Sequence, residues 1–304
     1  MEVYLPIAEM SVHWLVLLGL GAGVGFLSGL FGVGGGFLLT PLLVFYGIPS
    51  AIAVATTLSH ITASSISGAL AQWRRKAVDF TMAAVMSAGG LVGTLVGVWL
   101  FSIMRQQGQM DLVVGLSYVV LLGIVGGIML NESIATLRAR MGADVKRARP
   151  VNHVWIHGLP FKMRFRQSRL YISVIPPVVI GFVVGALSAI MGIGGGFIII
   201  PSMIYLLRMP TNMVVGTSLV QIIVITAFTT ILQATSNYTV DIVLAAILVA
   251  GGVVGAQFGV RVGAKLRGEQ LRLLMALLVL AVAIRLAWGL VVTPQDVYSI
   301  AFGS

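Results

Sequence analysis

Two glycine clusters are the residues of this chain whose type and spacing best suit a binding function. GVGGG occupies residues 32–36 and GIGGG residues 192–196, and a proline follows each cluster after five residues. Glycine in a helix costs roughly 1 kcal/mol relative to alanine, so each cluster should interrupt a helix. A helix that begins after such a break offers free backbone N–H groups and a partial positive charge, and glycine lets an anion come close to them. We therefore predict an anion site at Gly34, Gly35, Gly36, Gly194, Gly195 and Gly196; close helix packing is the alternative.

Polar side chains lie on the apolar segment that follows each cluster. VATTLSH at residues 54–60 matches VGTSLVQ at residues 215–221. Hydroxyl, imidazole and amide groups can coordinate an anion without a fixed charge, but such side chains also bond their own helix or join helices, and the sequence leaves both roles open. The candidates for substrate binding are Thr56, Thr57, His60, Gln72, Thr217, Ser218, Gln221 and Gln233. Arg285, well inside a late apolar segment, either lines the pathway or extends to the membrane surface.

The composition places these residues in a membrane. The 304-residue chain is 58% hydrophobic and 9% charged, whereas a soluble domain is about 25% charged. Apolar stretches long enough to cross the hydrocarbon core recur throughout. We predict an all-α polytopic membrane protein with about ten membrane helices, some short or broken. The net charge of +10 indicates basic cytoplasmic loops rather than nucleic-acid binding. Without cysteine or a phosphate-binding motif, we predict no metal, no cofactor and no enzymatic activity.

The chain also contains an internal duplication. GGLVGTLVGV at residues 89–98 matches GGVVGAQFGV at residues 251–260, and the other matches have a shift of 160–162 residues. We divide the chain into a first membrane repeat, 1–130, a basic linker, 131–169, and a second membrane repeat, 170–304. The second apolar segment of each repeat is too short to span comfortably, and paired interrupted segments mark the substrate site in inverted-repeat transporters.

The basic residues predict the orientation of the repeats. Arg74, Arg75 and Lys76 place the loop after the third segment in the cytoplasm. The equivalent loop of the second repeat, 235–241, has no basic residue, whereas the next loop is rich in them. We therefore predict two inverted five-helix repeats in the inner (plasma) membrane, with a cytoplasmic linker and both termini outside the cytoplasm.

Two smaller patterns concern the ends of these segments. Asp79 and Asp241 are repeat partners just before the fourth segments, where N-capping is the expected role. No acidic residue lies deep in a segment, so no buried carboxylate relay is predicted. Phe161, Met163 and Phe165 alternate with basic residues, which predicts a small cytoplasmic strand or hairpin in the linker.

The double motif resembles the sulfite exporter TauE/SafE family. The resemblance is carried by GxGGG and its proline at 32–41 and 192–201, each followed by a Thr-[Thr/Ser]-Leu segment, at 54–58 and 215–219. It covers nearly the whole chain. It implies a bacterial or archaeal inner-membrane carrier of sulfur-containing oxyanions such as sulfite, sulfoacetate or other organosulfonates, and export is implied by this resemblance alone.

Together these features predict a secondary transporter that holds a small anion at the glycine breaks near the midplane and works by alternating access. The alternatives are an anion channel and a carrier of a different small anion. The expected partners are the anionic substrate and the lipid bilayer. The anion, the direction, the coupling ion, a homo-oligomeric state and the role of the linker are left open by the sequence.

Overall fold

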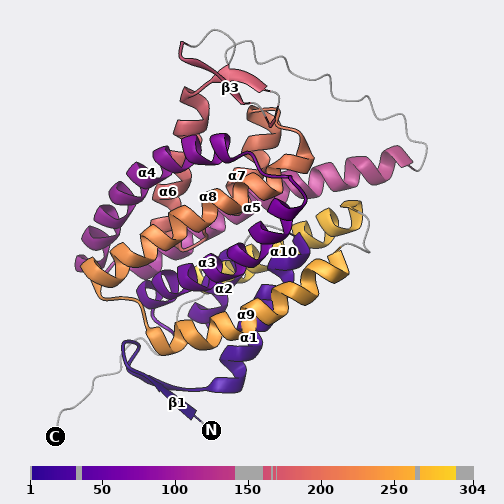
Figure 1. Ribbon diagram of the computed structural model, residues 1–304. Coiled ribbons are helices and arrows are strands. Elements are labelled where there is room, and N and C mark those ends of the chain that lie inside the picture. Colours follow the sequence, from indigo (N-terminus) through magenta and orange to yellow (C-terminus); the bar gives the residue numbers. More distant parts are fainter. Residues whose placement is uncertain are drawn as a thin grey trace, which may run out of the picture.

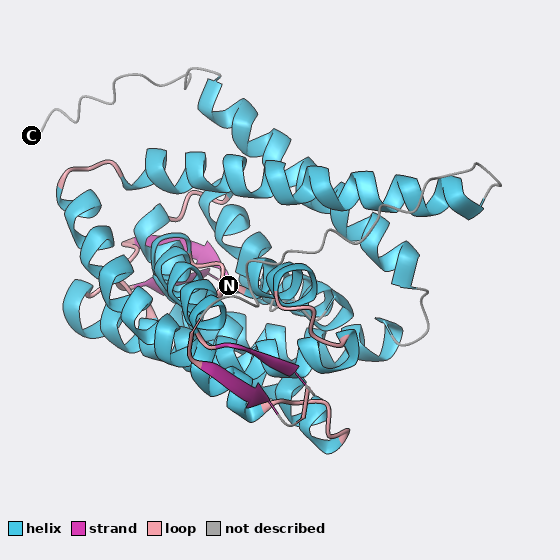
Figure 2. Cartoon of the chain, turned by 90° about the horizontal axis from the view of Figure 1, so that it is seen from above, coloured by secondary structure: helices cyan, strands magenta, loops and turns pink. Residues whose placement is uncertain are grey.

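The structure is a computed structural model, and it describes residues 2–31, 36–140, 160–165, 167–168, 170–263 and 268–291. Helices make up most of this part of the chain, and the strands form two short hairpins (Figures 1 and 2). The ten α-helices of the described residues are α1 (Trp14–Phe31), α2 (Gly36–Phe45), α3 (Ser50–Arg74), α4 (Phe80–Gln106), α5 (Met110–Arg140), α6 (Ile175–Met191), α7 (Gly196–Pro201), α8 (Thr211–Leu232), α9 (Ile242–Gly263) and α10 (Gly268–Val291).

Five described helices are long and apolar enough to cross a membrane: Phe80–Gln106, Met110–Asn131, Met213–Asn237, Ile242–Val262 and Leu273–Val291. This confirms an all-α membrane protein, while ten membrane crossings stay a prediction. α5 continues to Arg140, beyond the start of the segment expected to be a linker. Both segments expected to be short are short: α2 has 10 residues, and α7 has 6 and continues into the π-helical turn η2 (Ser202–Leu206).

The third helix is long but not apolar, because its sequence contains the polar residues predicted for the substrate pathway. Thr56, Thr57 and His60 are all fully buried within the fold. α3 packs against α8, α9 and α2, so its polar groups face protein. A helix enclosed by other helices need not present an apolar surface to lipid.

The two hairpins occupy equivalent positions in the two repeats. β1 (Glu2–Leu5) pairs with β2 (Met10–His13) directly before α1, and β3 (Lys162–Phe165) pairs with β4 (Leu170–Ser173) just before α6. The second hairpin confirms the pairing predicted from the alternating pattern; the first was not predicted. Figure 1 shows β1 and β3 at opposite ends of the molecule.

Two helices of each half pack against helices of the other half. α1 packs along α9, and α4 packs along α6. Gly25 on α1 lies against the backbone of Gly252, and its repeat partner Gly185 on α6 lies against the backbone of Gly90. A Cβ at Gly25 or Gly185 would overlap that backbone. These glycines therefore permit close helix contact, as glycine does in membrane proteins generally.

Asp79 and Asp241, at the starts of α4 and α9, also form contacts between segments that are far apart in sequence. Asp79 Oδ1 accepts hydrogen bonds from two N–H groups of the first turn of α4, and Asp241 Oδ1 does the same in α9. Both N-cap predictions are thus confirmed. In addition, Asp79 Oδ2 accepts from the N–H of Ser168 at 3.0 Å, and Asp241 Oδ2 accepts from the N–H of Ile7 at 3.0 Å. Each aspartate therefore fixes its own helix and the hairpin turn of the other half.

Candidate functional site

The two glycine-containing segments meet at the centre of the fold. The rings of Phe37 and Phe197, which follow the two clusters, stack with their centroids 5.1 Å apart. A Cβ at Gly36 would lie 2.8 Å from the carbonyl oxygen of Ile193, so the start of α2 touches the second cluster directly. Gly34 and Gly35 lie outside the described residues.

The second cluster forms a turn that depends on glycine. Gly192, Gly194 and Gly195 have φ values of +71°, +73° and +82°, in the left-handed region that side chains disfavour. Gly196 then begins α7. This turn leaves the first N–H groups of the helix without intrahelical acceptors. The turn is buried, and Gly194–Gly196 do not line either of the two cavities described below.

Several predicted polar residues are buried without hydrogen-bond partners. No hydrogen bond of normal geometry is made in the described part of the chain by either ring nitrogen of His60, which faces the Gly21 backbone, by either side-chain polar atom of Gln221, or by the hydroxyl of Thr57. His60 and Gln221 occupy equivalent positions in the two repeats, and each is fully buried. An unpartnered buried polar group costs roughly 1–3 kcal/mol. We call Thr57, His60 and Gln221 the central polar layer.

Other predicted residues already have structural partners. The hydroxyl of Thr56 accepts from the N–H of Asp241 at 3.2 Å, and that of Thr217 accepts from the N–H of Asp79 at 2.9 Å. Ser218 donates to a carbonyl of its own helix, 2.9 Å away. Gln233 donates to Ala189 O and accepts from Asn237. Thr56, Thr217 and Gln233 therefore hold different segments together in this conformation, whereas Ser218 bonds only its own helix.

A cavity of about 260 Å³ lies between α1, α3, α8 and α9. On α3 it is lined by Ser64, Ser67, Gln72 and Arg75, among others. We call it the α3 cavity. Ser64, Ser67 and Arg75 lie 4, 7 and 15 residues after His60 in sequence, so they share one face of the helix with it. Of these residues, the sequence analysis assigned only Gln72 to the site. The spacing from His60 was the signal that could have revealed the others.

The α3 cavity ends one helical turn from His60 on two sides. Ser64 is one turn further along α3, and Ala256, which lines the cavity on α9, is one turn beyond Gly252. A Cβ at Gly252 would overlap the His60 ring. The cavity thus leads from Arg75, at the end of α3, toward the central polar layer.

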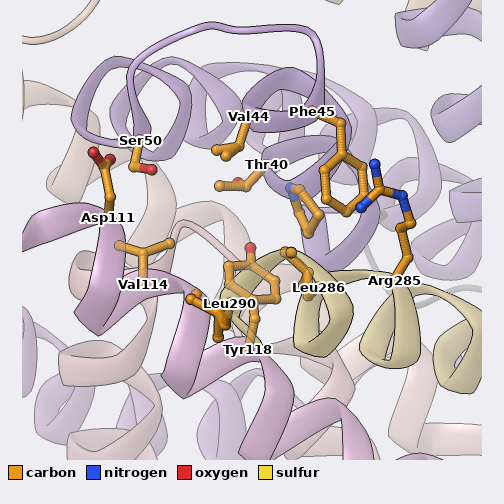
Figure 3. A pocket seen from close by; sticks show the side chains of 13 residues that line it. Thr40, Val44, Phe45, Ser50, Asp111, Val114, Tyr118, Arg285, Leu286 and Leu290 are labelled. Carbon is orange, nitrogen blue, oxygen red and sulfur yellow. The ribbon is translucent and has the colours of Figure 1, made fainter. Parts of the chain in front are cut away.

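A second cavity, also of about 260 Å³, lies between α2, the start of α3, α5 and α10. Figure 3 shows Arg285 on one of its sides and Asp111 on the opposite side. We call it the α5–α10 cavity. The Arg285 guanidinium lies 5.1 Å from the centroid of the Phe45 ring. Asp111 and Tyr118 could not be assigned to this cavity from the sequence, because its other lining residues are distant along the chain.

A comparison with protein families decides the classification of the chain. The model of the sulfite exporter TauE/SafE family matches residues 17–286. The chain belongs to this family. TauE/SafE membership agrees with the resemblance noted in the double glycine motif. The matched residues include the central polar layer and the lining of both cavities, except Gly289 and Leu290.

Curated relatives of this TauE/SafE protein bear the names of transporters. The chain is 29% identical to the probable membrane transporter protein YjnA of Bacillus subtilis over 91% of this chain and 100% of the relative. It is 30% identical to a probable membrane transporter protein of Xylella fastidiosa over 90% and 95% of the two chains. No solved structure matches it. The protein is therefore a multi-pass membrane transporter.

Proposed function

We propose that this protein is a secondary transporter of small sulfur-containing oxyanions, such as sulfite, sulfoacetate or other organosulfonates, and that it exports them from the cytoplasm across the inner membrane. The observation that supports this most is the α3 cavity, which runs from Arg75 to within one helical turn of His60 in the unpartnered central polar layer. A cation at the entrance of a cavity raises the local concentration of anions. The polar layer then supplies donors without a fixed charge, so that an anion can also leave.

Binding would relieve the cost of the unpartnered groups. Gln221 and Thr57 each carry hydrogen-bond donors, and so does neutral His60 through one ring nitrogen. An oxyanion placed among them gives these donors an acceptor. The glycine turn at residues 192–196 would complete the site once the helices around it separate, through the backbone N–H groups at the start of α7.

Reciprocal contacts support two inverted repeats. Equivalent helices pair with each other, α3 with α8 and α5 with α10, and the equivalent residues Phe37 and Phe197 stack together. Contacts between equivalent surfaces are typical of a two-fold relation. The hairpins at opposite ends of the molecule (Figure 1) fit a two-fold axis in the membrane plane, and inverted repeats of this kind are common in transporters that work by alternating access.

Counterflow in proteoliposomes tests the transport mechanism. Vesicles loaded with unlabelled sulfoacetate should accumulate labelled sulfoacetate transiently from outside, because a carrier exchanges substrate across the membrane. Chloride-loaded vesicles are the control. Equal uptake with and without trans substrate would indicate a channel, and no uptake of any sulfur oxyanion would point to a different anion.

The predicted topology can be read by labelling single cysteines, since the chain has no native cysteine. Ser236→Cys, in the turn before α9, should react with an impermeant maleimide only from outside the cell. Lys76→Cys, after α3, should react only in inverted vesicles. Both positions are exposed. Reaction of both cysteines from the same side would contradict the inverted arrangement.

A further inference from the structure

The α5–α10 cavity carries two opposite charges that do not neutralise each other directly. Arg285 comes from α10 and Asp111 from the first turn of α5. Neither side chain makes an ion pair with any described residue. Figure 3 shows them on opposite sides of the cavity, with apolar side chains between them. Both charges are therefore available to a third group.

Polar groups accompany the charges. Thr40 lines the cavity and is fully buried, and its hydroxyl faces Tyr118 without a hydrogen bond of normal geometry in the described part of the chain. Ser50 is 2% exposed and lies near Asp111 in Figure 3. The Phe45 ring lies beside the Arg285 guanidinium, which leaves the edge of that planar group free to donate in a forked geometry.

Apolar walls separate the two ends. Val44, Val114, Leu286 and Leu290 lie between Asp111 and Arg285 in Figure 3, together with Thr40 and the ring of Tyr118. Its volume of about 260 Å³ lies just below the range of roughly 300–1,000 Å³ that is usual for drug-sized ligands. A ligand that contacts both ends of this cavity would therefore be small, with a short apolar body and a charge at each end. The α3 cavity differs, because its lining contains Arg75 and no acidic residue.

From this arrangement we propose that the α5–α10 cavity binds a zwitterion. Its oxyacid group lies at the guanidinium of Arg285 and its ammonium group at the carboxylate of Asp111, with a short carbon chain between them along the apolar wall. This chemistry occurs in free ω-amino acids and in the phosphoethanolamine headgroup of lipids. The lipid source is relevant because Leu290 is 45% exposed on a helix that is apolar enough to span a membrane. The proposal does not depend on the substrate of the α3 cavity.

Calorimetry on the purified full-length protein tests whether the cavity binds a free ω-amino acid. The probe is 4-aminobutanoate, and butanoate and butylamine are the singly charged controls. We expect 4-aminobutanoate to bind at least 10-fold more tightly than either control. Arg285→Gln and Asp111→Asn should each weaken it about 10-fold or more, since each removes one charge-assisted contact. Asp111→Asn should strengthen butanoate binding, because it removes a repulsive carboxylate. Arg75→Gln, in the other cavity, should change none of these affinities.

Native mass spectrometry tests the lipid source. After extraction from mixed-lipid nanodiscs, the wild type should retain phosphatidylethanolamine over phosphatidylglycerol, and both Arg285→Gln and Asp111→Asn should lose this preference. Binding of either the free amino acid or the lipid supports the proposal if it depends on both Arg285 and Asp111. It is overturned if no zwitterion binds in either experiment, or if binding persists unchanged in Asp111→Asn. Both substituted side chains are exposed, and thermal unfolding of each variant checks that the fold is intact.

Discussion

Replacing His60 with leucine should abolish transport and make the folded protein more stable. The ring is fully buried and both of its nitrogens lack partners, so the fold bears a desolvation cost that leucine does not have. We expect a gain of about 1–3 kcal/mol in the free energy of unfolding. Gln221→Leu should behave in the same way, because Gln221 is the unpartnered repeat partner of His60. Thermal unfolding in detergent and sulfoacetate counterflow measure the two effects separately.

Thr56→Val is the matched control on the same helix. Its hydroxyl has a partner, the N–H of Asp241, and removing it leaves that buried donor without an acceptor. This substitution should therefore lower stability, the opposite sign to His60→Leu. His60→Gln, which copies the second repeat, should retain transport. If His60→Leu transports normally, or is less stable than the wild type, the central polar layer is structural and the binding site lies elsewhere.

Alanine at Gly194 or Gly195 should reduce transport more than 100-fold. Both residues have positive φ, where a Cβ costs roughly 1–2 kcal/mol. At Gly194 the new Cβ would also lie 2.8 Å from the side chain of Ile61, and at Gly195 it would overlap Val184. The turn would shift, and its N–H groups would no longer point at the anion. Initial rates of counterflow, corrected for the amount of inserted protein, measure this effect.

Gly23→Ala is the control that distinguishes an effect on the glycine turn from a general effect of replacing glycine with alanine. Gly23 lies in α1, and a Cβ there would have nothing within 4 Å. Alanine at this position should leave transport unchanged and stabilise the helix by roughly 1 kcal/mol. Wild-type affinity and rate in Gly195→Ala would show that the strained turn has no part in binding.

Repetition within the sequence predicted much of the fold. The match between residues 89–98 and 251–260 marks glycines that the structure places at equivalent helix contacts. The N-caps at Asp79 and Asp241 were predictable because capping is a local interaction within one helical turn. The hairpin at 162–173 was predictable from the alternation of its first strand.

Contacts between residues far apart in the chain could not be predicted from the sequence. Nothing local indicates that Thr56 meets Asp241, 185 residues away, and so the sequence analysis placed Thr56 with the substrate ligands. The N-terminal hairpin was missed because its first strand, EVYL, has three apolar or aromatic residues in a row and lacks the alternation with charged residues seen in the second hairpin. For the site itself, residue type alone could not separate side chains with partners from those without, since Thr56 and Thr57 are adjacent and differ only in what faces them.

The exchange of partners between the halves affects how the chain can be made. When the ribosome has completed the first half, the glycine face of α1 has no α9 to cover it, and α4 has no α6. The Ile7 N–H, in the turn of the first hairpin, cannot bond Asp241 until that residue has been synthesised, 234 residues later. The first half therefore enters the bilayer without its contacts to the second half, and these contacts form late in synthesis. Under the proposed inverted arrangement, a half-length ancestor would have covered the same surfaces by inserting into the membrane in both orientations and pairing with an oppositely oriented copy of itself.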